Sequence, residues 1–128
     1  MGYESRVYIV NEWDGNLGFE ENEKPLAEII AVFDLCCAED EVLDVLKNKA
    51  EEARCAVWES YDGGDIIITK DAYDNPLTSA SIVDVYNAIE YGKYWRTTAL
   101  KDYLHNLIIN RDNMSRDFES LKVYHYGY

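Results

Sequence analysis

Alternating apolar and polar residues near the start of the chain predict its first two strands. Residues 5–13 alternate and are rich in β-branched and aromatic side chains, which is typical of a β-strand. Residues 26–37 contain the short apolar run 29–33, which favours a buried strand over a helix. We expect the two strands to pair antiparallel across the acidic, turn-rich connection 14–24.

From residue 39 the spacing of apolar residues changes to steps of three and four. Val42, Val45, Leu46, Ala50 and Ala53 recur at these steps, which predicts an amphipathic helix. Acidic residues crowd its first turns and basic residues lie further along, which is the order that the helix dipole favours.

A β-hairpin is predicted next. Two strand-like segments, 55–61 and 66–69, flank the turn 62–65, and the two glycines of that turn supply the backbone freedom that a tight hairpin requires. Beyond a further turn at 74–76, the pattern returns to a helical period.

Two helices and a strand complete the predicted elements. Thr78 or Ser79 is expected to cap a helix that Gly92 closes, and a further helix covers about 95–111. The pair on either side of Gly92 is typical of an αα-hairpin. Residues 118–128 alternate again and predict a final strand.

The order of these elements predicts the fold class. The chain of 128 residues is 48% hydrophobic, enough for one core, and we expect a single domain over residues 1–128. Because strands and helices do not alternate regularly, we predict an α+β fold: a mainly antiparallel sheet of about five strands with about three helices packed on one face.

We find no transmembrane segment or signal peptide, so we expect a soluble, intracellular protein that does not bind a membrane. Three cysteines, Cys36, Cys37 and Cys55, fit neither a disulfide framework nor a zinc motif and are expected as free thiols.

Acidic residues are concentrated in the first half of the chain. Residues 1–65 contain 17 carboxylates and five basic residues, a net charge of about −12 out of −13 overall. Such a field attracts a basic protein and repels nucleic acid, so we expect no direct nucleic-acid binding. The carboxylates could stand where phosphates would and occupy the basic groove of a nucleic-acid-binding protein. The alternative is a solvated face that keeps the protein soluble. The candidate contacts are Asp14, Glu20, Glu21, Glu23, Glu39, Asp40, Glu41, Asp44, Glu51 and Glu52.

Tyrosine is the other abundant feature, with 11 residues. Tyr124, Tyr126 and Tyr128 fall on one face of the last predicted strand, where they form either an amphipathic surface or an interface. His125 points to the other face, where we expect a hydrogen-bonded structural histidine.

If that aromatic strand lines a pocket, a different function follows. Bases stack on tyrosine or tryptophan, and an arginine binds phosphate, so Arg6, Trp58, Tyr124 and Tyr126 are candidate ligands of a small nucleotide. The protein would then sequester a nucleotide signal. The observation that discriminates is whether Arg6 is buried beside aromatic side chains or lies bare on an edge.

Enzymatic motifs are missing from the sequence. It has no GxSxG, HExxH, P-loop or GxGxxG pattern. Asp62, Asp65, Asp71 and Asp74 cluster around two turns, but the spacing of a calcium-binding loop is absent and turn formation explains them more simply. We therefore predict a protein that is not an enzyme, with no catalytic residue, metal or cofactor, and keep metal-dependent catalysis as the lesser alternative.

Several segments of the chain resemble a family of small, functionally uncharacterised proteins of tailed bacteriophages and prophages. They are Gly2-Tyr3-Glu4-Ser5-Arg6-Val7-Tyr8-Ile9-Val10, Ala27-Glu28-Ile29-Ile30-Ala31-Val32-Phe33-Asp34-Leu35-Cys36, Asp71-Ala72-Tyr73-Asp74-Asn75-Pro76-Leu77 and His125-Tyr126-Gly127-Tyr128. The resemblance implies a viral protein in the cytoplasm of a bacterial host, and small proteins of this source often act against host defences by binding.

These observations combine into one expected function and two alternatives. We expect an inhibitor, of the anti-CRISPR kind, that binds a basic, nucleic-acid-binding host protein such as a CRISPR effector through its acidic face. The alternatives are a sponge for a small nucleotide and a structural or assembly component of the phage. Homodimerisation is left open.

Overall fold

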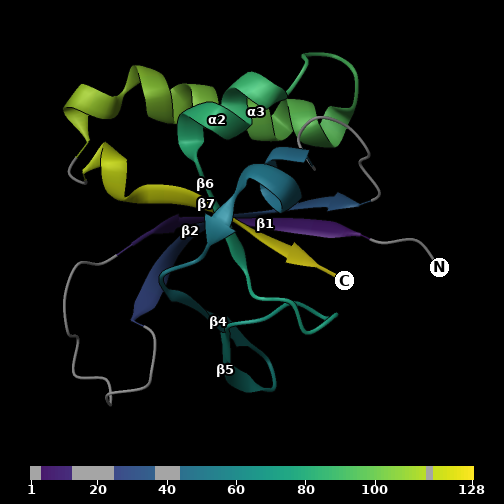
Figure 1. The fold of residues 1–128 in the computed structure, drawn as a ribbon. Helices are drawn as coiled ribbons and strands as arrows, with labels where there is room; N and C mark the ends of the chain where they lie inside the picture. Colours follow the sequence, from purple (N-terminus) through teal and green to yellow (C-terminus); the bar gives the residue numbers. More distant parts are fainter. Residues whose placement is uncertain (1–3, 13–24, 37–43, 115–116) are drawn as a thin grey trace.

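One curled, mixed sheet of seven strands organises the chain (Figure 1). The structure is a computed structural model and describes residues 4–12, 25–36, 44–114 and 117–128. The strand order is β3-β6-β7-β1-β2-β4-β5. The strands are β1 (Ser5–Asn11), β2 (Leu26–Cys36), β3 (Glu51–Glu52), β4 (Ala56–Tyr61), β5 (Gly64–Ile68), β6 (Thr78–Ser81) and β7 (Leu121–Gly127).

The first strand lies at the centre of the sheet because its side chains are buried on both faces. It pairs antiparallel with β2, as predicted, and antiparallel with β7, so that Val7 lies opposite Phe33 on one side and His125 on the other. Val7 and Ile9 enter one core cluster, and Tyr8 and Val10 enter the other. The alternation seen in the sequence therefore describes a strand with two buried faces.

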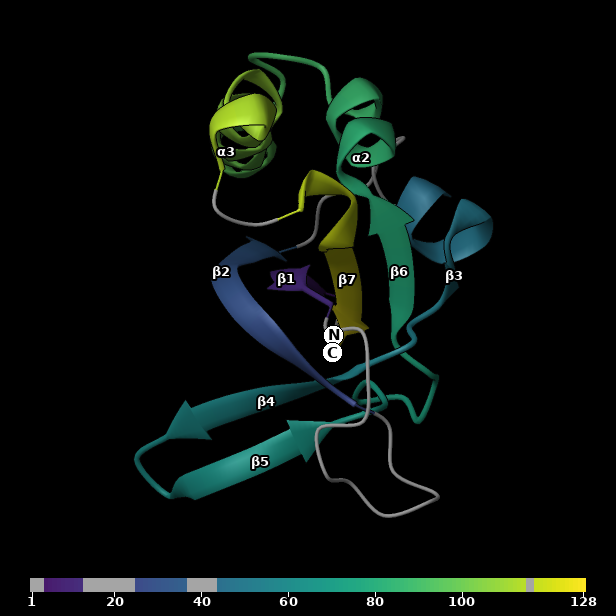
Figure 2. The same ribbon diagram turned by 90° about the vertical axis from the view of Figure 1, so that its left-hand side faces the viewer.

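Two helices cover one face of the sheet (Figure 2). They are α2 (Ile82–Ala88) and α3 (Trp95–Ile109), and their buried residues include Val85, Leu100 and Leu104. These side chains pack against Val7 and Ile9 of β1 in a single apolar cluster. The predicted helix pair on one face is confirmed. None of the helices in the described ranges combines the length and the apolar character needed to cross a bilayer.

The opposite face is closed by the strands themselves. The β4–β5 hairpin, at the end of the molecule away from the helices, joins the sheet through a short parallel pairing of Ala27 with Val57 (Figure 2). Val57 and Leu77 pack with Tyr8 and Tyr124 in the second core cluster. The one parallel pair makes the sheet mixed, whereas all other pairs are antiparallel as predicted.

The helix predicted from residue 39 is wrong over its second half. The described part is one π-helical turn, η1 (Val45–Lys49), after which Ala50 is extended with φ −78° and ψ 154°. The next residues form β3, and the Ala53 N–H donates to the Leu77 carbonyl at 2.9 Å. Pairing with β6 thus outweighs a weak local helical preference, because short helices depend on tertiary packing. The first part of that prediction, residues 39–43, lies outside the described residues, as does the connection 14–24.

The predicted start of the next helix is also wrong. Thr78 and Ser79 do not cap it, since they lie in β6, which pairs with β7. Ser81 is the cap: its Oγ accepts from the Asp84 N–H at 3.1 Å. The helix ends at Ala88, and Gly92 lies beyond it in the connection to α3 with φ +82°.

The sheet has two strands more than predicted, β3 and β6. Both are short segments whose pairing partners lie far along the chain.

Candidate functional site

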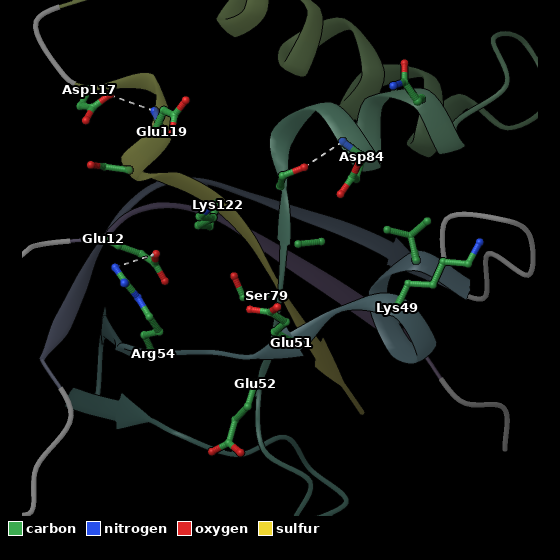
Figure 3. A pocket seen from close by; sticks show the side chains of 15 residues that line it. Glu12, Lys49, Glu51, Glu52, Arg54, Ser79, Asp84, Asp117, Glu119 and Lys122 are labelled. Carbon is green, nitrogen blue, oxygen red and sulfur yellow. Dashed lines mark hydrogen bonds and ion pairs between the residues drawn. The ribbon is translucent and has the colours of Figure 1, made fainter.

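Carboxylates line a hollow of about 740 Å³ between the β3–β6 edge of the sheet, the start of α2 and the beginning of β7 (Figure 3). We call this hollow the acidic groove. Its acidic residues are Glu12, Glu51, Glu52, Asp84, Asp117 and Glu119. Its basic residues in the described part of the chain are Lys49, Arg54 and Lys122, so the described lining carries a net charge of −3.

Local hydrogen bonds and strand pairing place the backbone of the residues that carry these carboxylates. The two glutamates of β3 lie at the edge of the sheet, where β3 pairs with β6 and Glu51 lies opposite Ser79, and their side chains point in different directions (Figure 3). The cap at Ser81 begins α2 and places Asp84 in its first turn. On the other wall, the Glu119 N–H donates to Asp117 Oδ1 at 3.1 Å within a 3₁₀ turn (Phe118–Ser120). Three separate elements thus contribute acid to one hollow.

Glu12 differs from the other groove acids because it is buried, with 5% of its surface exposed. The Tyr124 hydroxyl donates to its Oε2, and the Arg54 guanidinium lies 3.5 Å from its Oε1. The Cys55 N–H in turn donates to the Tyr124 hydroxyl at 3.3 Å. Burial, together with the hydrogen bond to Glu12, raises the pKa of Tyr124, so the phenol remains a donor. A buried charge requires such partners, and here they fix a carboxylate against the wall of the groove.

Three of the ten acidic contacts predicted from the sequence are described, and two of them line the groove. Those two are Glu51 and Glu52, both exposed. Asp44 does not line it: it accepts from Asn48 at 3.0 Å and pairs with Lys49 at 3.3 Å, which holds the pKa of Asp44 below its usual value. The remaining seven lie outside the described residues: Asp14, Glu20, Glu21, Glu23, Glu39, Asp40 and Glu41.

Four acids of the groove were missed by sequence reasoning: Glu12, Asp84, Asp117 and Glu119. The sheet register brings them together, since Asn11 lies opposite Leu121 and Ser81 lies opposite Lys122. No local pattern indicates that residues about a hundred positions apart share one hollow. The groove therefore takes carboxylates from both halves of the chain. The excess of acidic residues in positions 1–65 does not by itself produce the groove.

The residues of the alternative nucleotide pocket do not come together as one site. Arg6 lies over the rings of Tyr126 and Tyr128, with its Cζ 5.8 and 5.1 Å from the ring centres. Tyr124 is fully buried, and its hydroxyl is bound to Glu12. Trp58 is about half exposed, and on its strand it points to the face opposite its neighbour Glu59. The expected four-residue set is therefore divided: Arg6 and Tyr126 lie together, and the second ring beside Arg6 belongs to Tyr128, which was not in the set.

Carboxylates flank this arginine cluster. The Tyr8 hydroxyl donates to Glu59 Oε2 at 2.7 Å, and the Tyr128 hydroxyl donates to Asp34 Oδ2 at 2.8 Å. Burial, with a further contribution from Glu59, raises the pKa of Tyr8 to about 12. The hydrogen bond to Asp34 is the main cause that raises the pKa of Tyr128 to about 12. Two negative side chains so close to Arg6 weaken its attraction for phosphate.

Two smaller interpretations of the sequence are confirmed. His125 is buried on the face opposite the tyrosines, with its Nε2 3.0 Å from Ser5 Oγ, and burial lowers its pKa to about 4. Asp71 forms a turn, since its Oδ1 accepts from the N–H groups of Tyr73 and Asn75 at 2.9 and 3.0 Å. Within the described ranges, histidine, cysteine and carboxylate side chains form no group of three or more suited to a metal ion.

Comparisons with protein families, with curated proteins and with solved structures find no match to this chain.

Proposed function

We propose that this protein acts by binding, and that its acidic groove engages the basic surface of a nucleic-acid-binding host protein as a mimic of nucleic acid. One observation carries the proposal: among the described residues, six carboxylates from four separate segments line one open hollow, against three basic side chains. Scattered solubilising charge does not require such convergence. The groove thus offers several carboxylates at once to lysine and arginine side chains of a partner.

The physics of the groove favours fast, salt-sensitive binding. Its exposed carboxylates form pairs worth about 0–1 kcal/mol each, so affinity comes from several pairs together. The overall charge of −13 adds long-range attraction for a basic partner, which raises the association rate at low salt. Glu12 is buried and already bound by Tyr124 and Arg54, so the contacts with a partner fall to the exposed carboxylates.

The resemblance to phage proteins supplies the class of partner. In this proposal the protein works in the cytoplasm of a bacterial host, and the partner is a defence protein that handles nucleic acid, such as a CRISPR effector. Occupying the basic channel of that protein with carboxylates excludes its nucleic acid. The proposal involves no catalytic step and no cofactor.

Charge reversal at matched positions tests the proposal. The groove variant is Glu51→Lys/Glu52→Lys/Glu119→Lys, and the control variant Asp62→Lys/Asp102→Lys/Asp112→Lys changes three exposed acids elsewhere. Both change the net charge from −13 to −7. With a labelled lysine- and arginine-rich peptide as the probe, we expect the groove variant to lose at least tenfold in affinity and the control less than threefold. Equal losses would show that only net charge matters.

Sequestration of a small nucleotide remains a second candidate, favoured by the position of Arg6 over two tyrosine rings. It predicts that a nucleotide raises the melting temperature of the wild-type chain in a manner that tolerates salt. Arg6→Ala should abolish that shift, whereas Arg111→Ala, which removes an exposed arginine elsewhere, should not. A panel of mono-, di- and cyclic nucleotides that produces no shift would remove this candidate.

A further inference from the structure

The three basic side chains of the acidic groove differ in what they contact. The Lys49 ammonium lies 3.3 Å from Asp44, and the Arg54 guanidinium lies 3.5 Å from Glu12. Lys122, by contrast, makes no hydrogen bond or ion pair within the part of the chain that the structure describes. Two of the three therefore already have a carboxylate partner, and Lys122 is the one whose partner the described chain does not supply.

Strand pairing places Lys122 in the floor of the groove. It lies on β7, opposite Ser81 of β6 on one side and opposite Val10 of β1 on the other. Side chains alternate between the two faces of a strand, so Lys122 shares its face with Tyr124, whose hydroxyl donates to Glu12. The ammonium therefore belongs to the same face of the sheet as the buried carboxylate at the end of β1.

The same face continues in the other direction to the β3 edge. Ser79 of β6 lies opposite Tyr124, and Glu51 of β3 lies opposite Ser79. Residues opposite each other in an antiparallel pair point to the same face. Across the strands, the side chains of the floor thus follow in the order Glu51, Ser79 and Ser81, Lys122 and Glu12 (Figure 3). The chemical pattern is acid, hydroxyl, ammonium, acid.

This pattern restricts the surface that can cover the floor. Lys122 is partly exposed, so a partner can reach it. A basic side chain placed over it is repelled, and an apolar one covers the ammonium without giving it a partner. A carboxylate placed over it, with basic side chains on either side, meets an opposite charge at every position. The floor is therefore complementary to a mixed pattern of charge, and an uninterrupted row of cations does not match it.

We propose that Lys122 is a specificity residue of the acidic groove, and that it selects a protein surface in which one carboxylate lies between basic side chains. This inference rests on the proposed function, since it concerns what the groove binds. The net charge of −13 attracts any polycation, so overall charge cannot distinguish one basic protein from another. A like charge inside the groove supplies that distinction, because it penalises the wrong partners.

A scan of a basic peptide with aspartate tests the proposal. The probe is a short labelled peptide of lysine and arginine in which one position at a time carries either aspartate or the uncharged asparagine. Net charge alone favours every asparagine peptide, because each has one positive charge more than its aspartate counterpart. We expect the wild-type chain to reverse this order at one interior position, where fluorescence anisotropy should show at least threefold tighter binding of the aspartate peptide.

Variants of Lys122 assign that preference to its charge. Lys122→Gln should bind the asparagine peptide more tightly at the same position, whereas Lys122→Arg, which keeps the charge, should retain the wild-type preference. Lys93→Gln is the matched control, because Lys93 is exposed in the connection between α2 and α3 and its loss changes the net charge equally. It should leave the ratio of the two affinities unchanged. Melting curves check that the variants are folded.

The outcomes separate this inference from the proposed function. If the asparagine peptide binds the wild type more tightly at every position, or if Lys122→Gln keeps the wild-type preference, the role of Lys122 is contradicted while binding by the groove stands. If the groove variant Glu51→Lys/Glu52→Lys/Glu119→Lys binds all peptides as tightly as the wild type does, the peptides bind elsewhere and both proposals fail.

Discussion

Removal of the Tyr124 hydroxyl probes the contact that holds Glu12 in the wall of the groove. In Tyr124→Phe the ring keeps its place in the second core cluster, where Tyr124 is fully buried. The hydroxyl is the only part that is lost. Glu12 then retains the Arg54 guanidinium at 3.5 Å but loses its phenolic donor.

The magnitude follows from the two hydrogen bonds of that hydroxyl. A hydrogen bond to a charged acceptor contributes about 1.5–3 kcal/mol, and a neutral one about 0.5–1.5 kcal/mol. The hydroxyl donates to the Glu12 carboxylate and accepts from the Cys55 N–H. We therefore expect the free energy of unfolding to fall by about 3 kcal/mol. For a chain of this size the melting temperature should fall by about ten degrees.

Urea unfolding followed by circular dichroism measures this change. Tyr94→Phe is the matched control because it removes the same atom from an exposed side chain, and its effect should stay within about 0.5 kcal/mol. A loss below about 1 kcal/mol in Tyr124→Phe would refute the reasoning. It would mean that water or a rearranged Arg54 replaces the phenol, and that Glu12 is not fixed by the core.

Three further predictions concern stability. The pKa of His125 is about 4 in the folded chain and about 6.5 in the unfolded chain, so the free energy of unfolding should fall by about 3 kcal/mol as pH drops from about 7 to about 4. Urea unfolding of His125→Gln should show a smaller fall over the same pH range. Gly64 has φ +124°, so Gly64→Ala should cost about 1–3 kcal/mol, whereas Gly63→Ala should cost clearly less; equal losses in thermal melts would contradict the strain argument. Ser81→Ala removes the cap of α2 and should cost about 1 kcal/mol, an effect that Ser81→Asp should largely avoid.

Much of the fold could be predicted from local patterns. The alternation of residues 5–13 and the apolar run 29–33 identify the central pair of strands, and the glycine turn at 62–65 identifies the β4–β5 hairpin. The spacing of residues 95–111 identifies α3. The two missed strands, β3 and β6, are two and four residues long. Segments this short have too few positions for a period, and their pairing alone makes them strands.

The candidate site was less predictable than the fold. Acidic composition led us to predict binding to a basic partner, and of the three predicted contacts that the structure describes, Glu51 and Glu52 line the groove and Asp44 does not. Glu12 looks like the polar end of a strand, and its burial depends on Tyr124, over a hundred residues away. The tyrosine strand was similarly ambiguous, since its alternation does not reveal that Tyr124 is buried while Tyr126 lies beside Arg6.

The most direct measurement is capture of nucleic-acid-binding proteins from a bacterial lysate by three immobilised chains in parallel. These are the wild type, the groove variant Glu51→Lys/Glu52→Lys/Glu119→Lys and the control variant Asp62→Lys/Asp102→Lys/Asp112→Lys. We predict that a basic protein is retained at low salt by the wild type and the control, is released at high salt, and is not retained by the groove variant. Retention of the same proteins by both triple variants would contradict the assignment of the acidic groove as the binding site.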